Sequence, residues 1–159
     1  MSIMLPPYQY VIDSSALFDL KNRYPENIFP GLWDRFNEMC EQRLIVAPRE
    51  VRAEVKKGND ELLEWVDRFP QMFLEPCEKE IEILQDVMDF YSPQILAKYG
   101  TGVWADPFVI SCAKNYRLTI IQHENLSGSY KIPHLAKHFN IPYMDLVEFF
   151  KDSGWSFTQ

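Results

Sequence analysis

Tyr8-Gln9-Tyr10-Val11-Ile12-Asp13-Ser14-Ser15 is the stretch of sequence from which the fold can be built outward. Its aromatic and β-branched residues up to Ile12 are typical of a buried strand. The sequence turns polar at Asp13, and Ser14 begins a predicted short helix. Asp13 therefore lies at the carboxyl end of the predicted first strand.

Two further apolar runs predict buried strands at residues 44–47 and 118–122, and a brief strand is predicted at 72–74. Between the strands, apolar residues recur at helical spacing. Strands that alternate with helices predict an α/β fold, with a central parallel sheet flanked by helices on both faces and the first strand in its middle. The predicted helices span residues 25–43 with a break near Pro30, 48–57, 60–69 with Asp60 as its cap, 78–99 with an interruption at Ser92-Pro93, 106–116, 133–139 and 144–152.

Four acidic residues fall where such a fold places its ligands. In parallel α/β sheets the ligand crevice lies beyond the carboxyl ends of the strands. Asp13 and Glu124 follow two predicted strands, whereas Glu54 and Asp106 border the apolar stripes of two predicted helices. A carboxylate at a buried helix edge costs free energy unless it is paired or bound to metal. Each acid alone is also explained as a helix cap or a rim charge, but four together predict a shared site.

The net charge of −7 has the wrong overall sign for a nucleic-acid-binding protein, because phosphate binding rests on Lys and Arg. Two explanations stay open. Clustered acids bind metal while a local basic patch binds phosphate, or nucleic acid is not the partner. Arg49, Arg52 and Lys56 fall on one face of the predicted helix 48–57 and can guide phosphate, although a solvated helix face explains them equally well.

The three cysteines, Cys40, Cys77 and Cys112, form no C-x-x-C pair, so we expect reduced thiols in a cytoplasmic protein. A signal peptide has a basic start and a long apolar stretch, and the first residues of this sequence have neither. No apolar run approaches the roughly 20 residues of a membrane helix. We therefore expect a soluble protein with no membrane partner.

Three stretches of the sequence resemble the four motifs of PIN domains, in order and in strand context. Val11-Ile12-Asp13-Ser14-Ser15 resembles the opening motif, and Pro48-x-x-Val51-x-x-Glu54 resembles the second. The stretch from Ala105-Asp106 through Ala113, followed by residues 118–124, is similar to the third and fourth motifs together. The resemblance covers residues 8–150 and looks closest to a bacterial PIN-like family of unassigned function. Two departures are Glu124, where many PIN domains carry Asp, and Gly102, where some nucleases of this type add an acid.

The resemblance implies a single PIN-like domain over residues 1–159 and a metal-dependent endoribonuclease, which is often the toxin of a bacterial toxin–antitoxin pair. It implies RNA as substrate, an antitoxin protein as a partner, and a homodimer. Asp13, Glu54, Asp106 and Glu124 are then the catalytic and metal-binding residues, with Ser14, Arg49 and Arg52 toward the substrate. The alternative is a catalytically silent PIN-like protein that binds RNA or protein.

The residue types favour particular chemistry at this site. Carboxylates without neighbouring Cys or His suit Mg²⁺ or Mn²⁺ better than zinc. Ser14 is expected to hydrogen-bond the Asp13 carboxylate or substrate rather than to attack. A phosphatase with Asp13 as nucleophile is a third hypothesis, but it would want a second acid at the position of Ser15.

The last residues are rich in aromatics, with Phe149, Phe150, Trp155 and Phe157 close together. Chain ends fray unless they are tied down, and exposed aromatic patches mark interfaces. We therefore expect this tail either to pack across the domain or to contribute to a homodimer.

Overall fold

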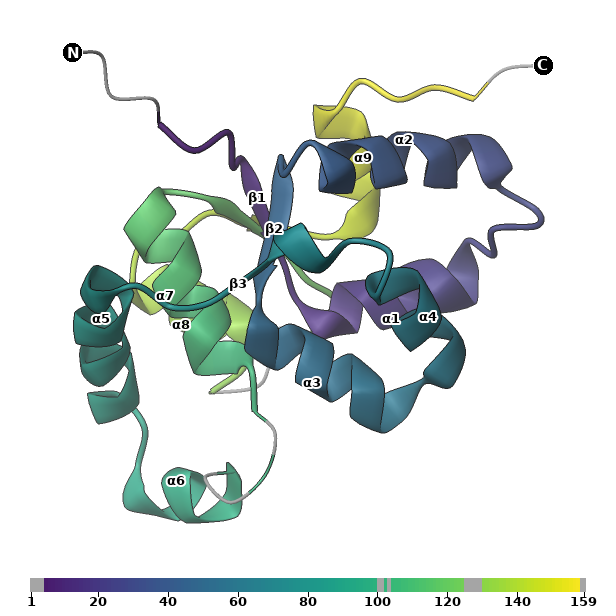
Figure 1. Cartoon of the computed structure of the whole chain (residues 1–159). Coiled ribbons are helices and arrows are strands. Elements are labelled where there is room, and N and C mark those ends of the chain that lie inside the picture. The colour runs from purple at the N-terminus through teal and green to yellow at the C-terminus, as the bar shows by residue number, and fades with distance from the viewer. Residues whose placement is uncertain (1–4, 100–101, 103, 125–129, 158–159) are drawn as a thin grey trace.

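The computed structural model describes residues 5–99, 102, 104–124 and 130–157. Within these residues a five-stranded sheet forms in the order β3-β2-β1-β4-β5 (Figure 1). Every neighbouring pair of strands is parallel. The first strand is central, as predicted. The bounds are β1 (Tyr10–Ile12), β2 (Ile45–Pro48), β3 (Phe73–Leu74), β4 (Thr119–Ile121) and β5 (Tyr143–Met144).

Helices cover both faces of this sheet, which confirms the predicted α/β fold class. Figure 1 shows α5, α7 and α8 on one side of the sheet and α1, α2, α4 and α9 on the other. The bounds are α1 (Ser14–Arg23), α2 (Pro30–Glu41), α3 (Arg49–Gly58), α4 (Asp60–Val66), α5 (Glu78–Asp89), α6 (Pro93–Tyr99), α7 (Asp106–Tyr116), α8 (Ile132–His138) and α9 (Leu146–Asp152), with a 3-10 turn at Pro70–Met72.

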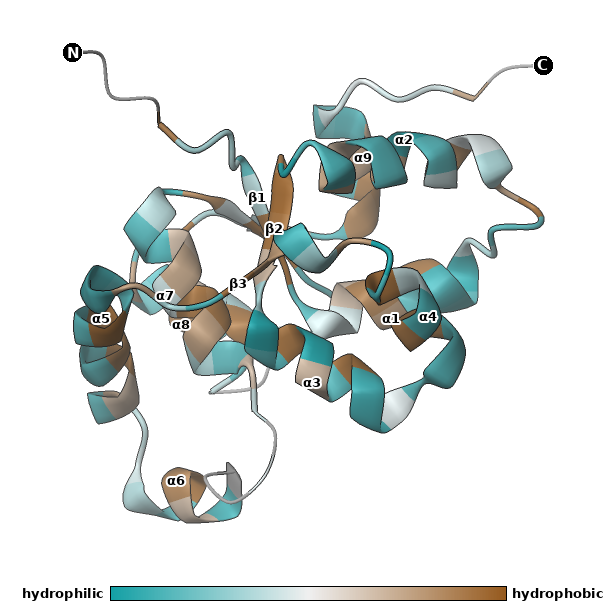
Figure 2. Ribbon diagram, in the orientation of Figure 1, coloured by the Kyte–Doolittle hydropathy of each residue, from teal (hydrophilic) through white to brown (hydrophobic). Residues whose placement is uncertain are grey.

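The core explains why the central strands read as continuous apolar runs. All residues of β1 and β2 are buried, since helices cover both sides of the strands. Figure 2 shows β2 as mostly hydrophobic, whereas the outward sides of the surrounding helices are largely hydrophilic. The register aligns Val11 with Ile120 and Ile12 with Ile121. The chain therefore leaves β1 and β4 at the same level, and the residues after both strands meet at one edge.

Three local predictions differ from the structure. Asn59, rather than Asp60, caps α4, because its side chain accepts a hydrogen bond from the Leu62 backbone N–H. Helix α1 continues to Arg23 and is longer than expected. The strand β5 was not predicted at all, because it has only two residues, which follow Pro142 and are only partly buried.

The carboxyl-terminal tail packs on its own chain. The Trp155 ring stacks on Phe150, with 5.5 Å between ring centroids. The Phe157 ring lies against Gly31, and the Arg35 guanidinium sits 5.3 Å from its centroid. The intramolecular form of the tail prediction is thus observed, and a homodimer stays a prediction.

Two expectations from composition can also be compared with the structure. Cys40, Cys77 and Cys112 are free thiols. Among the described residues, no helix has both the length and the apolar character needed to cross a membrane.

Candidate metal centre

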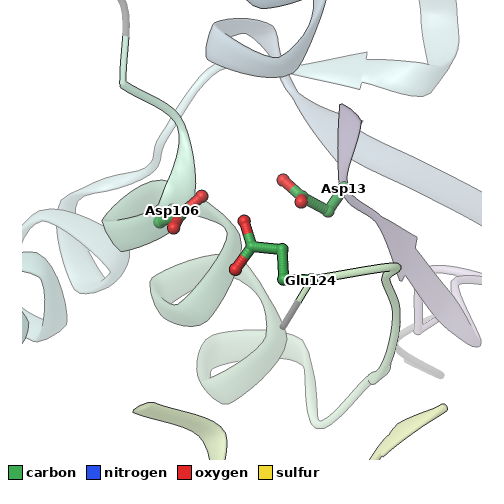
Figure 3. Close-up of side chains that lie close together, drawn as sticks. All are labelled: Asp13, Asp106 and Glu124. Atoms are coloured by element: carbon green, nitrogen blue, oxygen red, sulfur yellow. The ribbon is translucent and has the colours of Figure 1, made fainter. Parts of the chain in front are cut away.

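Three carboxylates converge at the carboxyl edge of the sheet. Asp13, Asp106 and Glu124 each offer an oxygen atom, and these atoms lie within 4.8 Å of one another. Figure 3 shows the three side chains pointing toward a common centre from three separate segments. Asp13 follows β1, Asp106 is the first residue of α7, and Glu124 follows β4. We refer to Asp13, Asp106 and Glu124 below as the carboxylate trio.

Asp13 is held in place because it directly follows β1 and is also the N-cap of α1. Its Oδ2 accepts hydrogen bonds from the Ser15 hydroxyl at 2.6 Å and from the Ser15 backbone N–H at 3.4 Å. The same hydroxyl accepts the His123 backbone N–H at 2.9 Å and so joins the ends of β1 and β4. Asp13 Oδ1 is buried and has no hydrogen-bond partner among the described residues.

Glu124 is held by its own backbone and by the start of α8. Its Oε2 accepts the Ile132 backbone N–H at 2.6 Å, and its N–H donates to Gln122 Oε1 at 2.6 Å. Helix N-termini offer unpaired N–H groups to carboxylates in this way. The Glu124 carboxylate, although on a longer side chain than the Asp expected here, therefore lies close to those of Asp13 and Asp106.

Glu54 lies beside the trio rather than within it. Its Oε1 accepts the Ser14 hydroxyl at 2.8 Å, and its carboxylate also accepts a hydrogen bond from the Ala105 backbone. Ser14 and Ala105 are the chain neighbours of Asp13 and Asp106, so Glu54 connects the two segments that carry them. The expected hydrogen bond from the Ser14 hydroxyl to Asp13 is wrong. Helix geometry turns Ser14 toward α3, and Ser15 takes that role.

The electrostatics of the trio are those of acids crowded out of water. Burial raises the pKa of Asp106 to about 10, and the charges of Asp13, Glu124 and Glu54 add to the effect. Burial also raises the pKa of Glu124 to about 7, helped by the charge of Asp13. The pKa of Asp13 is raised by burial, although hydrogen bonds from Ser15 oppose the change. Such a cluster is stabilised by a cation, because a positive charge removes the repulsion between the carboxylates.

The donor set fits a hard divalent cation. All candidate ligand atoms are carboxylate oxygens, and the bare Asp13 Oδ1 leaves a coordination position open. The ion pairs formed by the described residues lie elsewhere in the chain, so none neutralises the trio. Neither a thiol nor an imidazole belongs to the trio. Mg²⁺ or Mn²⁺ as the occupant stays a prediction.

The structure does not bring Arg49 and Arg52 to the trio. Arg52 donates from Nε and Nη2 to Asp67 Oδ1, at 3.0 and 2.9 Å. Arg49 lies near Glu50 and Glu75, at 3.8 and 3.6 Å. Both arginines point away from Glu54, because their positions lie more than a quarter turn from it around α3. Their predicted contact with substrate therefore gains no support from the structure.

Sequence reasoning missed four residues that shape this site. Lys131 lies close enough to Glu54 and Glu124 for its charge to lower the pKa of both carboxyls. Ser15 and Gln122 hold the acids as described above. The Tyr91 ring is buried near Asp106 and Glu124. No local motif marks these four, since each reaches the site through tertiary contacts.

Comparison with known proteins gave one family match over most of the chain. A model described as "Domain of unknown function (DUF4411)" matches residues 10–157. A comparison with curated proteins gave no significant match.

Two solved structures are similar to the chain. VapBC2 from Rickettsia felis, bound to a DNA fragment from their promoter, is 14% identical, with 86% of this chain and 97% of that chain covered and a TM-score of 0.48. PAE2754 from Pyrobaculum aerophilum is 13% identical, with 92% and 97% covered and a TM-score of 0.46. Values this low carry no information about what this chain binds. The predicted α/β fold with a parallel sheet and a central first strand is confirmed, and Asp13, Asp106 and Glu124 meet at its carboxyl edge. The assignment to PIN-like domains stays a prediction.

Proposed function

The chain belongs to the family described as a domain of unknown function (DUF4411), and we propose that it is a divalent-metal-dependent endoribonuclease. One observation carries the proposal. Three buried carboxylates share one centre at the carboxyl edge of a parallel sheet, and one of their oxygens has no hydrogen-bond partner among the described residues. A site of this kind costs folding free energy, which a bound cation recovers.

Asp13, Asp106 and Glu124 would hold the metal, with Mg²⁺ or Mn²⁺ as the proposed cofactor. When bound, such an ion neutralises charge on a phosphodiester and lowers the pKa of a coordinated water. Ser15 keeps Asp13 Oδ2 turned toward α1, which leaves Oδ1 for the metal. Glu54 keeps the segments of Asp13 and Asp106 together. Its carboxylate would also hold a water molecule at the site.

Lys131 takes the phosphate-guiding role that the sequence suggested for Arg49 and Arg52. It is exposed, and its charge acts on two of the four acids. A cation at this position attracts a phosphodiester to an otherwise acidic site. The net charge of −7 is then compatible with an RNA substrate, because the excess of acids is partly the metal site itself.

The resemblance to PIN domains supports a further assignment as the toxin of a bacterial toxin–antitoxin pair, with an antitoxin that covers the acidic cleft. The catalytically silent binding module remains the alternative, and metal binding separates the two. Ligand at one hundred times its Kd stabilises a protein by about 2.7 kcal/mol, so a functional centre should show a clear rise in melting temperature with Mn²⁺.

The deciding experiment is cleavage of a mixed RNA pool by pure protein with Mn²⁺, with cut sites mapped. Asp13→Asn should abolish both cleavage and the Mn²⁺-dependent rise in melting temperature, while the fold is kept because Asn has nearly the same shape. Asp34→Asn, at an exposed position on α2, is the matched control and should behave as wild type. Cleavage by Asp13→Asn at the wild-type rate would refute the catalytic assignment. Mn²⁺ binding without cleavage would favour the silent alternative.

A further inference from the structure

Tyr91 presents a buried hydroxyl that nothing in the described chain satisfies. The residue follows α5 and is only 4% exposed. Its hydroxyl oxygen is inaccessible and has no hydrogen-bond partner among the described residues. Leaving a buried polar group unpaired is unfavourable, so an orphan of this kind calls for an explanation.

The hydroxyl lies at the metal centre rather than in the general core. The charges of Asp106 and Glu124 both act on it and, after burial, raise the pKa of the phenol. The rings that pack against Tyr91 agree with this placement. The Tyr91 ring packs edge-on against Trp104 at 4.6 Å between centroids and stacks on Tyr130 at 5.5 Å. Trp104 lies two residues before Asp106, and Tyr130 lies two residues before the Ile132 that donates to Glu124.

The ring has little freedom to turn its hydroxyl elsewhere. Phe90 adds a third aromatic contact, at 6.4 Å between centroids. Aromatic rings packed on several sides keep one orientation. The hydroxyl therefore stays near two carboxylates without forming a hydrogen bond to either. Its O–H group is held in place for an acceptor that is not part of the described chain.

We propose that the Tyr91 hydroxyl donates a hydrogen bond to a phosphoryl oxygen of the substrate bound at the carboxylate trio. The inference rests on the proposed function, because a phosphodiester must reach the metal site. Three features favour this acceptor. It is anionic, and hydrogen bonds to charged acceptors are the stronger ones. It arrives only with substrate, which explains why the donor is unpaired without it. And a phosphate on the metal lies next to Asp106 and Glu124, as the Tyr91 hydroxyl does.

The test is Tyr91→Phe, which removes only the hydroxyl. In metal-free protein the melting temperature should stay the same or rise, since an unsatisfied polar group is lost. Mn²⁺ affinity should not change. Affinity for a single-stranded RNA, measured before cleavage has proceeded, and kcat/KM for the same RNA should fall about 10- to 100-fold.

Tyr116→Phe is the matched control. The Tyr116 hydroxyl bonds Glu80, outside the metal centre, so this variant should melt at a lower temperature and handle RNA normally. Four results overturn the inference. The first is that Tyr91→Phe binds and cleaves RNA as wild type does. The second is that Tyr91→Phe melts well below wild type. The third is that it changes Mn²⁺ affinity in place of RNA affinity, which would assign the hydroxyl to a metal-bound water. Wild-type protein that neither binds nor cuts RNA removes the proposed function and this inference with it, whereas the other three results leave the nuclease intact.

Discussion

Replacing Asp106 by Asn should stabilise the metal-free protein, although Asp106 lies at the proposed centre of activity. In the unfolded chain this carboxyl ionises near 3.8, whereas burial and the neighbouring acids raise its folded pKa to about 10. A folded pKa above the unfolded one means that stability is fully present below pH 3.8 and falls as the pH rises. From 3.8 to 7 each pH unit is worth about 1.4 kcal/mol, so the cost at pH 7 is about 4 kcal/mol.

Asn keeps the shape of the protonated acid and does not ionise, so Asp106→Asn should recover up to about 4 kcal/mol at pH 7. Urea unfolding in the presence of a chelator measures the gain, which should shrink toward zero at pH 4. Saturating Mn²⁺ should reverse the order, because only wild type offers the full trio to the ion. Asp34→Asn, an exposed acid on α2, should show neither effect.

The reasoning is wrong if Asp106→Asn is less stable than wild type in chelator at pH 7. It is also wrong if the difference between the two proteins is the same at pH 4 and pH 7. The first result would mean that Asp106 is ionised and well paired in the metal-free protein. The second would mean that the stability change comes from packing rather than from the proton.

Three further predictions concern other parts of the molecule. Glu80 is buried away from the trio and its pKa is raised by burial, so wild type should lose stability from pH 4.5 to 7.5 more steeply than Glu80→Gln in urea unfolding. Ser15→Ala removes the hydrogen bonds to Asp13 and His123, and should lower Mn²⁺ affinity about tenfold in a calorimetric titration. Truncation after Gly154 removes the Trp155 stack and should cost about 1 kcal/mol, with no change of mass in light scattering; a halved mass would show that the tail builds a dimer.

The sequence predicts the fold well because its strongest signals are local. The three central strands are mostly apolar. Asp13 directly follows β1 and Glu124 lies three residues past the end of β4, so the strand-end rule is enough to bring both acids to one edge. Asp106 shares the buried side of its helix with Val109 and Ile110, which gives the third member. Spacing within each segment therefore carries most of the information about the trio.

Side-chain partners could not be predicted, because they depend on contacts between distant segments. Arg52 binds Asp67 from the next helix, which no helical-face argument for residues 48–57 could foresee. Ser15 rather than Ser14 donates its hydroxyl to Asp13, because neighbouring helical residues point in directions that differ by roughly 100°. Tyr91 has no sequence signal, since it comes near Asp106 only when α7 packs on α5.

The order of the acids along the chain has a consequence for the timing of synthesis. Glu124 follows Asp13 by 111 residues, the difference of their numbers, and its hydrogen-bond donor Ile132 comes later still. The strand β1 also has to wait for β4 before its second edge is paired. At roughly 5–20 residues per second, the ribosome needs on the order of 5–20 s between the first acid and the last. A nascent chain therefore carries no complete carboxylate trio until most of the domain has been made.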